Sequence, residues 1–253
     1  MANSPNVNAV AVIPARYESS RFPGKPLAQI AGQTMIQRVY ERAKEAKRIA
    51  RVIVATDDER IVSAVKSFGG EAAMTRKDHH CGTERVAEVA AHTAAAIYVN
   101  VQGDEPLIDP KAIDALVGAM EEDAEILIAT PCSVIHQSAE IMDPNVVKAV
   151  VDFDGDALYF SRAPIPWVRD TVATVAPRHL KHIGLYAFRH EALLEFPTLP
   201  PGDLERVEQL EQLRWLENGY KIRIVEYEYE AVSVDVPADV ARVEKILSDR
   251  GLS

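Results

Sequence analysis

Three cations lie close together in an early loop of the chain. Arg16, Arg21 and Lys25 fall within ten residues, directly after the apolar stretch 10–13. That stretch is short and rich in β-branched residues, which is typical of a strand buried on both faces. Because open α/β sheets bind ligands at the carboxyl ends of their strands, these cations favour an anionic ligand such as a phosphate. The alternative is an ordinary solvated basic loop.

The glycines and prolines of this loop separate it from the common nucleotide-binding motifs. Pro14 is expected to end the strand, and Pro23, Gly24 and Pro26 disfavour a continuous helix. Ser19 stands where a Walker loop needs its first glycine, and Pro26 follows the lysine. No glycine follows the strand before Gly24, so the dinucleotide fingerprint G-x-G-x-x-G is also missing. The sequence therefore argues against a Walker-type ATPase and against a Rossmann oxidoreductase.

Two aspartates are expected at the ends of other strands. Asp104 follows the predicted strand Ile97–Val101 beside Gly103, which allows a ligand to approach closely, and Asp235 lies in the apolar segment Val232–Val236. Mg²⁺ is typically held by one or two carboxylates together with substrate phosphates, so this pair is sufficient for a metal site. The alternatives are a turn residue for Asp104 and a helix N-cap for Asp235.

A polar loop at 75–85 leads into a predicted helix that Thr83 would cap, and it could receive a nucleotide base. His79, His80 and Cys81 invite a zinc interpretation. Adjacent side chains diverge, however, and no fourth ligand stands at a suitable spacing, so zinc is not favoured.

The second half of the chain holds polar residues suited to an acidic, hydroxylated substrate. Arg162 follows a predicted strand and offers a planar fork for a carboxylate, although a surface ion pair is the alternative. His182 and Tyr186 are four residues apart, so in a strand they share a face, and both could equally be core residues. Glu211 interrupts the apolar face of the predicted helix Leu204–Glu217, where a buried acid needs a partner.

The elements that would position these residues alternate between strand and helix in the first half of the chain. The expected strands are 10–13, 51–55, 71–74 and 97–101, and the expected helices are 35–46, 58–68, 83–95 and 109–120. Such repeats imply a mostly parallel sheet with right-handed crossovers and flanking helices.

The second half predicts an antiparallel hairpin from Val146–Val151 and Ala157–Phe160, a strand at His182–Phe188, last strands within Ile222–Val234 and a helix Ala238–Leu247 after Pro237. Thr171–Arg178 has no clear period and is expected to be a loop. The fold class is therefore α/β, with a mixed, mostly parallel Rossmann-like sheet and a smaller antiparallel lobe. We expect one domain over 1–253, with substrate binding and dimerisation in about 145–220.

Composition narrows the functional classes. The chain has 253 residues, 47% of them hydrophobic, and a formal charge of -10, which disfavours general binding to nucleic acid. No apolar run approaches the roughly 20 residues needed to span a bilayer, and the first eight residues do not resemble a signal peptide, so a cytoplasmic protein is expected. The two cysteines, Cys81 and Cys132, are expected to be reduced thiols.

Taken together, several of these motifs resemble the sugar-activating nucleotidyltransferases, and one family in particular, the 3-deoxy-manno-octulosonate cytidylyltransferases, also called CMP-KDO synthetases. The resemblance covers about residues 10–247. Its motifs fall in the family's order and are Ile13–Leu27, Thr75–Arg85, Val99–Pro106, Tyr159–Trp167 and Val232–Val236.

The resemblance implies a set of site residues. Catalytic roles fall to Arg16, Lys25, Asp104 and Asp235, with the two aspartates as Mg²⁺ ligands. Nucleotide binding falls to Ala15, Arg16, Arg21, Lys25, Arg76, Gly82 and Gln102. Binding of the sugar acid falls to Gln102, Arg162, His182, Tyr186, Glu211 and Gln212. This chain has His80 and Cys81 where typical members have Gln-Ser, so no base contact is assigned to those two side chains.

The implied activity is Mg²⁺-dependent transfer of CMP from CTP to 3-deoxy-D-manno-octulosonate, with release of pyrophosphate, for lipopolysaccharide biosynthesis. A homodimer is expected. The alternatives are a cytidylyltransferase for another acid sugar, such as sialic acid or an amino-substituted octulosonate, and a nucleotide-binding module without turnover. Retention of both Asp104 and Asp235 argues against the module, because binding phosphates needs cations more than it needs a metal pair.

Overall fold

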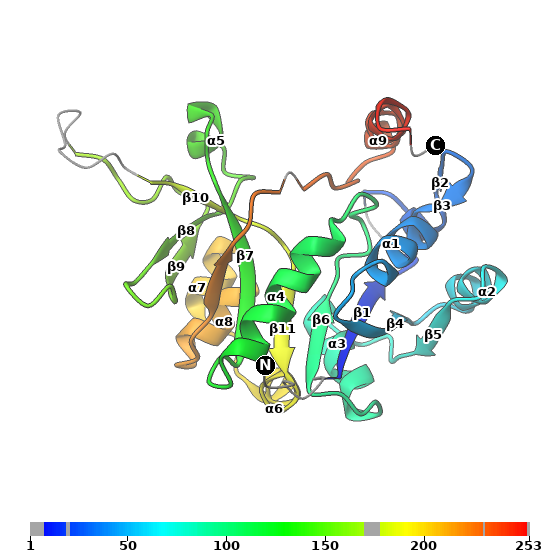
Figure 1. The fold of residues 1–253 in the computed structure, drawn as a ribbon, viewed down its shortest axis with the longest axis horizontal. Helices are drawn as coiled ribbons and strands as arrows, with labels where there is room; N and C mark the ends of the chain where they lie inside the picture. Colours follow the sequence, from blue (N-terminus) through cyan, green and yellow to red (C-terminus); the bar gives the residue numbers. More distant parts are fainter. Residues whose placement is uncertain (1–7, 19–20, 170–177, 230, 252–253) are drawn as a thin grey trace, which may run out of the picture.

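One large twisted sheet runs through the computed structural model, which describes residues 8–18, 21–169, 178–229 and 231–251 (Figure 1). Its first half consists of parallel strands in the order β5-β4-β1-β6. The bounds are β1 (Ala9–Ala15), β4 (Ile49–Thr56), β5 (Glu71–Met74) and β6 (Ile97–Asn100). The predicted parallel half is confirmed.

The second half of the sheet is mainly antiparallel. The order continues from β6 through β11, β7, β10 and β8 to β9, and β12 pairs in parallel with β7. The bounds are β7 (Ile128–Val134), β8 (Lys148–Val151), β9 (Ala157–Ser161), β10 (Leu180–His182), β11 (Tyr186–Arg189) and β12 (Arg223–Glu226). The predicted hairpin is β8–β9, and it extends the main sheet. A separate small antiparallel sheet joins β2 (Gln29–Ile30) to β3 (Gln33–Thr34). The α/β class with a mixed sheet is thereby confirmed.

Helices cover both faces of the sheet. Their bounds are α1 (Met35–Lys44), α2 (Glu59–Ser67), α3 (Gly82–Ala91), α4 (Pro110–Glu122), α5 (Ser138–Met142), α6 (His190–Glu195), α7 (Asp203–Glu208), α8 (Gln212–Glu217) and α9 (Ala238–Asp249), with short 3₁₀ turns η1 (Lys25–Leu27) and η2 (Phe196–Thr198). Thr34 and Asp58 accept hydrogen bonds from the first turns of α1 and α2 and so cap these helices. In the described residues no helix is long and apolar enough to cross a membrane.

The alternation of β1 divides the core in two. Ala9, Ala11 and Ile13 face one cluster with α1, α4 and α9, whereas Val10 and Val12 face the other with α3, α6 and α8. Both faces of this central strand are therefore buried, as its apolar sequence indicated.

The expected strand end at Pro14 is wrong, because β1 continues to Ala15. Val12 O accepts a hydrogen bond from Val101 N, so residues 12 and 14 turn their backbone polar groups toward β6. Pairing with β6 stops at Val12, and Pro14 therefore sits where no ladder donor is required.

The single strand predicted at His182–Phe188 is in fact β10 and β11, separated by Ile183–Leu185. Within this break Leu185 N donates to Ile183 O at 2.7 Å, a tight turn that takes the backbone off the regular ladder. Both strands still pair with β7, so the break acts as a bulge.

The helix predicted at Leu204–Glu217 is also two elements, α7 and α8. Gln209 lies between them with a φ of 53°, the left-handed conformation that ends α7. Leu204 and Val207 are exposed, so the apolar spacing used to place Glu211 on a helical face did not mark a buried face.

Two predictions near the end of the chain also need correction or remain open. Among the described residues of the segment Ile222–Val234, only Arg223–Glu226 form a strand, and the residues directly before Asp235 do not. In the loop expected at Thr171–Arg178, residues 171–177 lie outside the described residues.

Lys148 ties together the two chain segments that flank the hairpin and gives a test of this packing. Its buried ammonium donates to the carbonyls of Asp143, Val146 and Arg162. Lys148→Met should lower the free energy of unfolding by about 2–4 kcal/mol, because three carbonyls lose their donor. Urea unfolding measures this, with the exposed Lys245→Met as control. Equal stability of the two variants would contradict the assignment.

Candidate active site

A cavity of about 370 Å³ opens at the carboxyl ends of β1 and β6, beside the basic loop. Many of its lining residues belong to the set predicted for the nucleotide and the metal. These are Ala15, Arg16, Arg21, Lys25, Gly82, Gln102 and Asp104. We refer to this cavity as the cradle.

Two glycines allow the backbone of the cradle to close. Gly24 has a φ of 72° and its amide donates to Tyr17 O at 2.8 Å, which folds the loop back and starts η1 at Lys25. At Gly103, a Cβ atom would lie 2.8 Å from Pro14 O, so only glycine lets the end of β6 approach β1 this closely.

Lys25 links two distant segments at the cradle wall. Its ammonium lies 2.7 Å from the Asp104 carboxylate and donates to Val234 O at 2.9 Å. Val234 N in turn donates to Asp104 O at 2.9 Å, which brings residue 235 next to the predicted metal ligand. The lysine side chain is 15% exposed and that of Asp104 is 31% exposed. The pair is therefore shielded but open to a ligand.

Asp235 faces a cation of the same loop. Its carboxylate lies 2.9 Å from the Arg21 guanidinium, and both side chains are exposed. Asp235 does not cap α9, whose N-cap is Pro237, and its own amide donates with that of Val236 to the carboxylate of Asp239. The Asp235 side chain is thus available at the rim of the cradle.

Asp104 and Asp235 fit a magnesium site only in part. No group of three or more His, Cys, Asp or Glu side chains in the described ranges is arranged to hold a metal. Two carboxylates, joined through Lys25 and Val234, supply a portion of the oxygen ligands that Mg²⁺ requires. The remaining ligands would have to come from a substrate and water.

The loop at 75–85 forms another wall. Arg16 donates to His80 O at 3.0 Å, so the basic loop and the expected base-binding loop are tied together. A Cβ at Gly82 would lie 3.3 Å from the Pro14 ring, which shows how closely this loop passes β1. The helix begins one residue before the predicted cap, with Cys81 rather than Thr83 at the N-cap.

Of the two arginines at 75–85, the one predicted to bind the nucleotide lies outside the cradle and the other lines it. Arg76 does not line the cradle, and its exposed guanidinium lies 3.5 Å from Asp78. Arg85, which sequence analysis missed, does line it and is fully buried, with its guanidinium 3.0 Å from Asp57 and also bonded to Thr75. The available signal was an arginine among the apolar residues of a helix.

A chain of polar side chains leads from the cradle to the predicted sugar-acid residues. Gln102 donates to Asn100, Asn100 to Thr83, and Thr83 to the carboxylate of Glu211. Tyr186 pairs with Asn100 across β11 and β6. Asn100 and Thr83 were not among the predicted residues, since neither carries a charge or a recognisable spacing.

His182 joins this group despite the break between β10 and β11. Its ring lies 5.4 Å from that of Tyr186, and its Nε2 lies 2.9 Å from Thr130 Oγ1. The threonine hydroxyl donates to Leu185 O at 2.7 Å, so Oγ1 accepts from an Nε2–H on the histidine. Burial lowers the pKa of His182 to about 3, which makes the ring neutral and leaves Nδ1 as an acceptor.

The other members of the group are partly or fully buried as well. Burial raises the pKa of Glu211, while its bonds to Cys81 and Thr83 and the charge of Arg214 oppose the rise. Burial also raises the pKa of Tyr186 well above its ordinary value. Gln212 is buried beside them, and its Nε2 has no partner among the described residues. Such groups can bind the hydroxyls of a ligand through hydrogen bonds.

Arg162 approaches from the end of β9. Its guanidinium donates to the carbonyls of Glu208, Pro144 and Gln209 at 2.8, 2.9 and 3.4 Å. These bonds use three of the five N–H donors of an arginine, so two remain for a ligand. The side chain is thus anchored to the turn that precedes Glu211.

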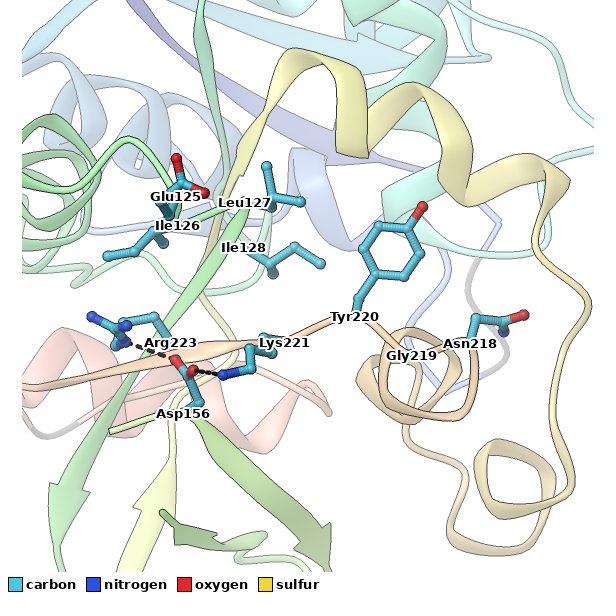
Figure 2. A pocket seen from close by; sticks show the side chains of 10 residues that line it. All are labelled: Glu125, Ile126, Leu127, Ile128, Asp156, Asn218, Gly219, Tyr220, Lys221 and Arg223. Atoms are coloured by element: carbon cyan, nitrogen blue, oxygen red, sulfur yellow. Dashed lines mark hydrogen bonds and ion pairs between the residues drawn. The ribbon is translucent and has the colours of Figure 1, made fainter. Parts of the chain in front are cut away.

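A second, larger cavity of about 540 Å³ lies at the amino ends of β7 and β12 (Figure 2). Figure 2 shows Asp156 between Lys221 and Arg223, which it binds at 3.0 and 2.8 Å. Asp156 thus pairs with both cations of this cavity, and the cavity lies at the opposite strand ends from those that bind ligands in such sheets. The cradle is therefore the candidate active site.

Comparison with known proteins gives a consistent picture. A family described as "Cytidylyltransferase" matches residues 10–222. The chain is 56% identical to the 3-deoxy-manno-octulosonate cytidylyltransferase of Solibacter usitatus over 235 residues, covering 93% of this chain and 92% of that protein. It is 55% identical to that of Syntrophotalea carbinolica over 252 residues, covering 97% and 100%.

Solved structures are similar as well. One is a CMP:2-keto-3-deoxy-manno-octonic acid synthetase complexed with CTP, with a TM-score of 0.92 and 46% identity, covering 96% of this chain and 99% of that one. A cytidylyltransferase from Leptospira borgpetersenii has a TM-score of 0.65 at 18% identity, covering 96% and 87%, and shares the fold.

The buried neutral His182 predicts a pH dependence of stability. Its pKa is about 3 in the folded chain against 6.5 ordinarily, so the unfolded chain binds the extra proton between these values. Stability should therefore fall as the pH decreases from about 6.5 toward 3, by up to about 1.4 kcal/mol per pH unit. The free energy of unfolding of His182→Gln, measured with urea at several pH values, should not show this decrease.

The exposed His92→Gln serves as the control and should keep the wild-type slope. An identical slope in wild type and His182→Gln would show that His182 is not buried as a neutral ring.

Proposed function

We propose that this chain, which belongs to the cytidylyltransferase family, transfers CMP from CTP to 3-deoxy-manno-octulosonate and releases pyrophosphate. The observation that carries the proposal is the junction at Gln102. On one side of this residue lies the cationic cradle with Lys25 and Asp104, and on the other lies the group of polar side chains that ends at Glu211. A triphosphate and a hydroxylated acid can thus be held next to each other.

In the proposed reaction the anomeric hydroxyl of the sugar attacks the α-phosphate of CTP in line and loses its proton to solvent, while the bond to the β-phosphate breaks and pyrophosphate leaves. Arg16, Arg21 and Lys25 bind the phosphates, and Lys25 stabilises the charge that develops on the transferring and leaving groups. His182, Tyr186 and Glu211 orient the sugar through its hydroxyls. Positioning supplies most of the rate enhancement, and no covalent intermediate on the protein is required.

A magnesium ion belongs to this proposal. Asp104 and Asp235 would hold it together with phosphate oxygens, and when bound it supplies charge neutralisation and lowers the pKa of a coordinated hydroxyl. Glu211 is not required as a base in this scheme, and its carboxylate accepts the hydrogen bond from Thr83.

The proposal also includes that the chain forms a homodimer in the cytoplasm and supplies CMP-KDO to lipopolysaccharide biosynthesis. Exposed apolar side chains at Phe153, Leu158 and Trp167 support a dimer contact within 145–220. Light scattering of the purified chain tests the oligomeric state.

The activity is tested by pyrophosphate release from CTP, UTP, ATP and GTP with Mg²⁺ across a panel of acid sugars. Release with CTP and 3-deoxy-manno-octulosonate, and much less with sialic acid, is expected. Preference for another acid sugar would replace the proposed acceptor. No release with any pair would contradict the activity itself.

Shared ligation of one metal predicts non-additive losses at Asp104 and Asp235. Either Asp→Asn change should lower kcat by about 100-fold or more, because charge stabilisation at the transition state is lost. The double variant should lose far less than the product of the single losses. The measurement is kcat against Mg²⁺ concentration for both single variants and the double.

Asp109→Asn is the matched control, since Asp109 caps α4 by accepting from Lys111 N. That variant should keep its turnover and most of its stability, because Asn caps a helix about as well as Asp. Multiplicative losses at Asp104 and Asp235, with an unaltered metal dependence, would contradict a shared metal.

Arg162→Lys should raise the KM for the sugar acid about tenfold and leave the KM for CTP nearly unchanged. Lysine keeps the charge but loses the planar fork and the donors that anchor the side chain. Steady-state kinetics with each substrate varied in turn measures both constants, and Arg206→Lys at the exposed pair with Asp203 is the control. An equal rise in both KM values would count against this placement.

A further inference from the structure

Both proposed metal ligands are paired with cations of the chain itself. Asp104 lies 2.7 Å from the Lys25 ammonium, and Asp235 lies 2.9 Å from the Arg21 guanidinium. The two carboxylates and the two cations sum to no net charge at this wall of the cradle. A free divalent cation would meet two ligands whose charge is already balanced.

Lys25 holds a central position in this arrangement. Besides Asp104 it binds Val234 O at 2.9 Å, directly before Asp235, so one ammonium bridges the segments that carry both ligands. Its side chain is 15% exposed, and a shielded ion pair is screened less by water and salt than a surface pair. A dication that displaced this ammonium without offering it another partner would leave a shielded cation unpaired.

A nucleoside triphosphate changes the balance. Its phosphate oxygens offer Lys25 and Arg21 new anionic partners, and they also supply oxygen ligands that the protein lacks. The described chain presents no cluster of three or more ligating side chains, so two carboxylates are its contribution. Nucleotide and metal should therefore each improve the binding of the other.

We propose that Lys25 and Arg21 are charge stand-ins at the metal ligands, so that a divalent cation binds this chain tightly only together with the nucleoside triphosphate. The inference rests on the proposed nucleotidyl-transfer function. Lys25 thus has two successive partners, the Asp104 carboxylate before the nucleotide binds and a phosphate afterwards. It is a positioning residue in the first state and a binding residue in the second.

Binding of Mn²⁺, a paramagnetic probe for Mg²⁺, tests this without turnover. Free Mn²⁺ is counted by electron paramagnetic resonance during titration of the protein alone. CTP binding is measured by calorimetry with EDTA and with saturating Mn²⁺, and is corrected for the Mn²⁺–CTP complex in solution. For the wild type, we expect Mn²⁺ to bind at least about 100-fold more weakly without CTP than with it, the upper part of typical coupling.

Removing a stand-in should have opposite effects on the two measurements. Lys25→Met and Arg21→Met should each bind Mn²⁺ alone about tenfold more tightly than the wild type, and should bind the Mn²⁺–CTP complex more weakly. Arg21 lies in an exposed pair, so its variant keeps the test informative if Lys25→Met does not fold. Lys181→Met is the control, because its ion pair with Glu140 at 2.8 Å has a similar exposure away from the cradle.

Equal Mn²⁺ affinity of the wild type with and without CTP would overturn the inference, as would unchanged Mn²⁺ affinity in a folded Lys25→Met and in Arg21→Met. Failure of CTP to bind in every condition would instead contradict the proposed function. The change in Mn²⁺ affinity of the two variants decides the stand-in role in either case.

Discussion

The contact on which the candidate site depends is that of the Lys25 ammonium with Asp104 and Val234 O. It joins the loop after β1, the end of β6 and the segment before α9, three parts of the chain that are far apart in sequence. A cation held at a partly shielded position by acceptors from two distant segments constrains how those segments meet. The same constraint leaves the site ready for a phosphate, which can replace the carboxylate.

The change from parallel to antiparallel pairing explains how two kinds of site can adjoin. Parallel strands β1 and β6 end together and place their loops around the cradle. Antiparallel β11 pairs with β6 and brings Tyr186 opposite Asn100, at the edge of the cradle. One strand boundary thus separates the cationic cradle from the group of polar side chains that ends at Glu211, and Gln102 lies at that boundary.

The sequence predicted the first half of the fold well because its signals are local. Buried strands, capping residues such as Thr34 and Asp58 and glycine stops each act over a few residues. The second half was less predictable, since the break at Ile183–Leu185 and the left-handed Gln209 depend on contacts with distant strands and loops. The residue types at these positions do not by themselves indicate such conformations.

Predictions for the site followed the same division. Charged residues at strand ends, such as Lys25 and Asp104, were recognisable by type and position. Arg85 and Thr83 were not recognisable in this way. The role of Arg85 comes from the packing of α3 against β1, and that of Thr83 comes from its contact with Glu211. Arg76 shows the converse, as a charged loop residue that lies outside the cradle.

Comparing turnover with thermal unfolding in Lys25→Ala tests most directly whether this lysine belongs to the chemistry rather than to the core. Turnover per folded molecule should fall about 100-fold or more, because a preorganised charge is lost at the transition state. Tm should fall by only about 2–4 °C, which corresponds to about 1 kcal/mol in a chain of this size. Normal turnover, or a loss of turnover that merely follows the fraction unfolded, would contradict the account.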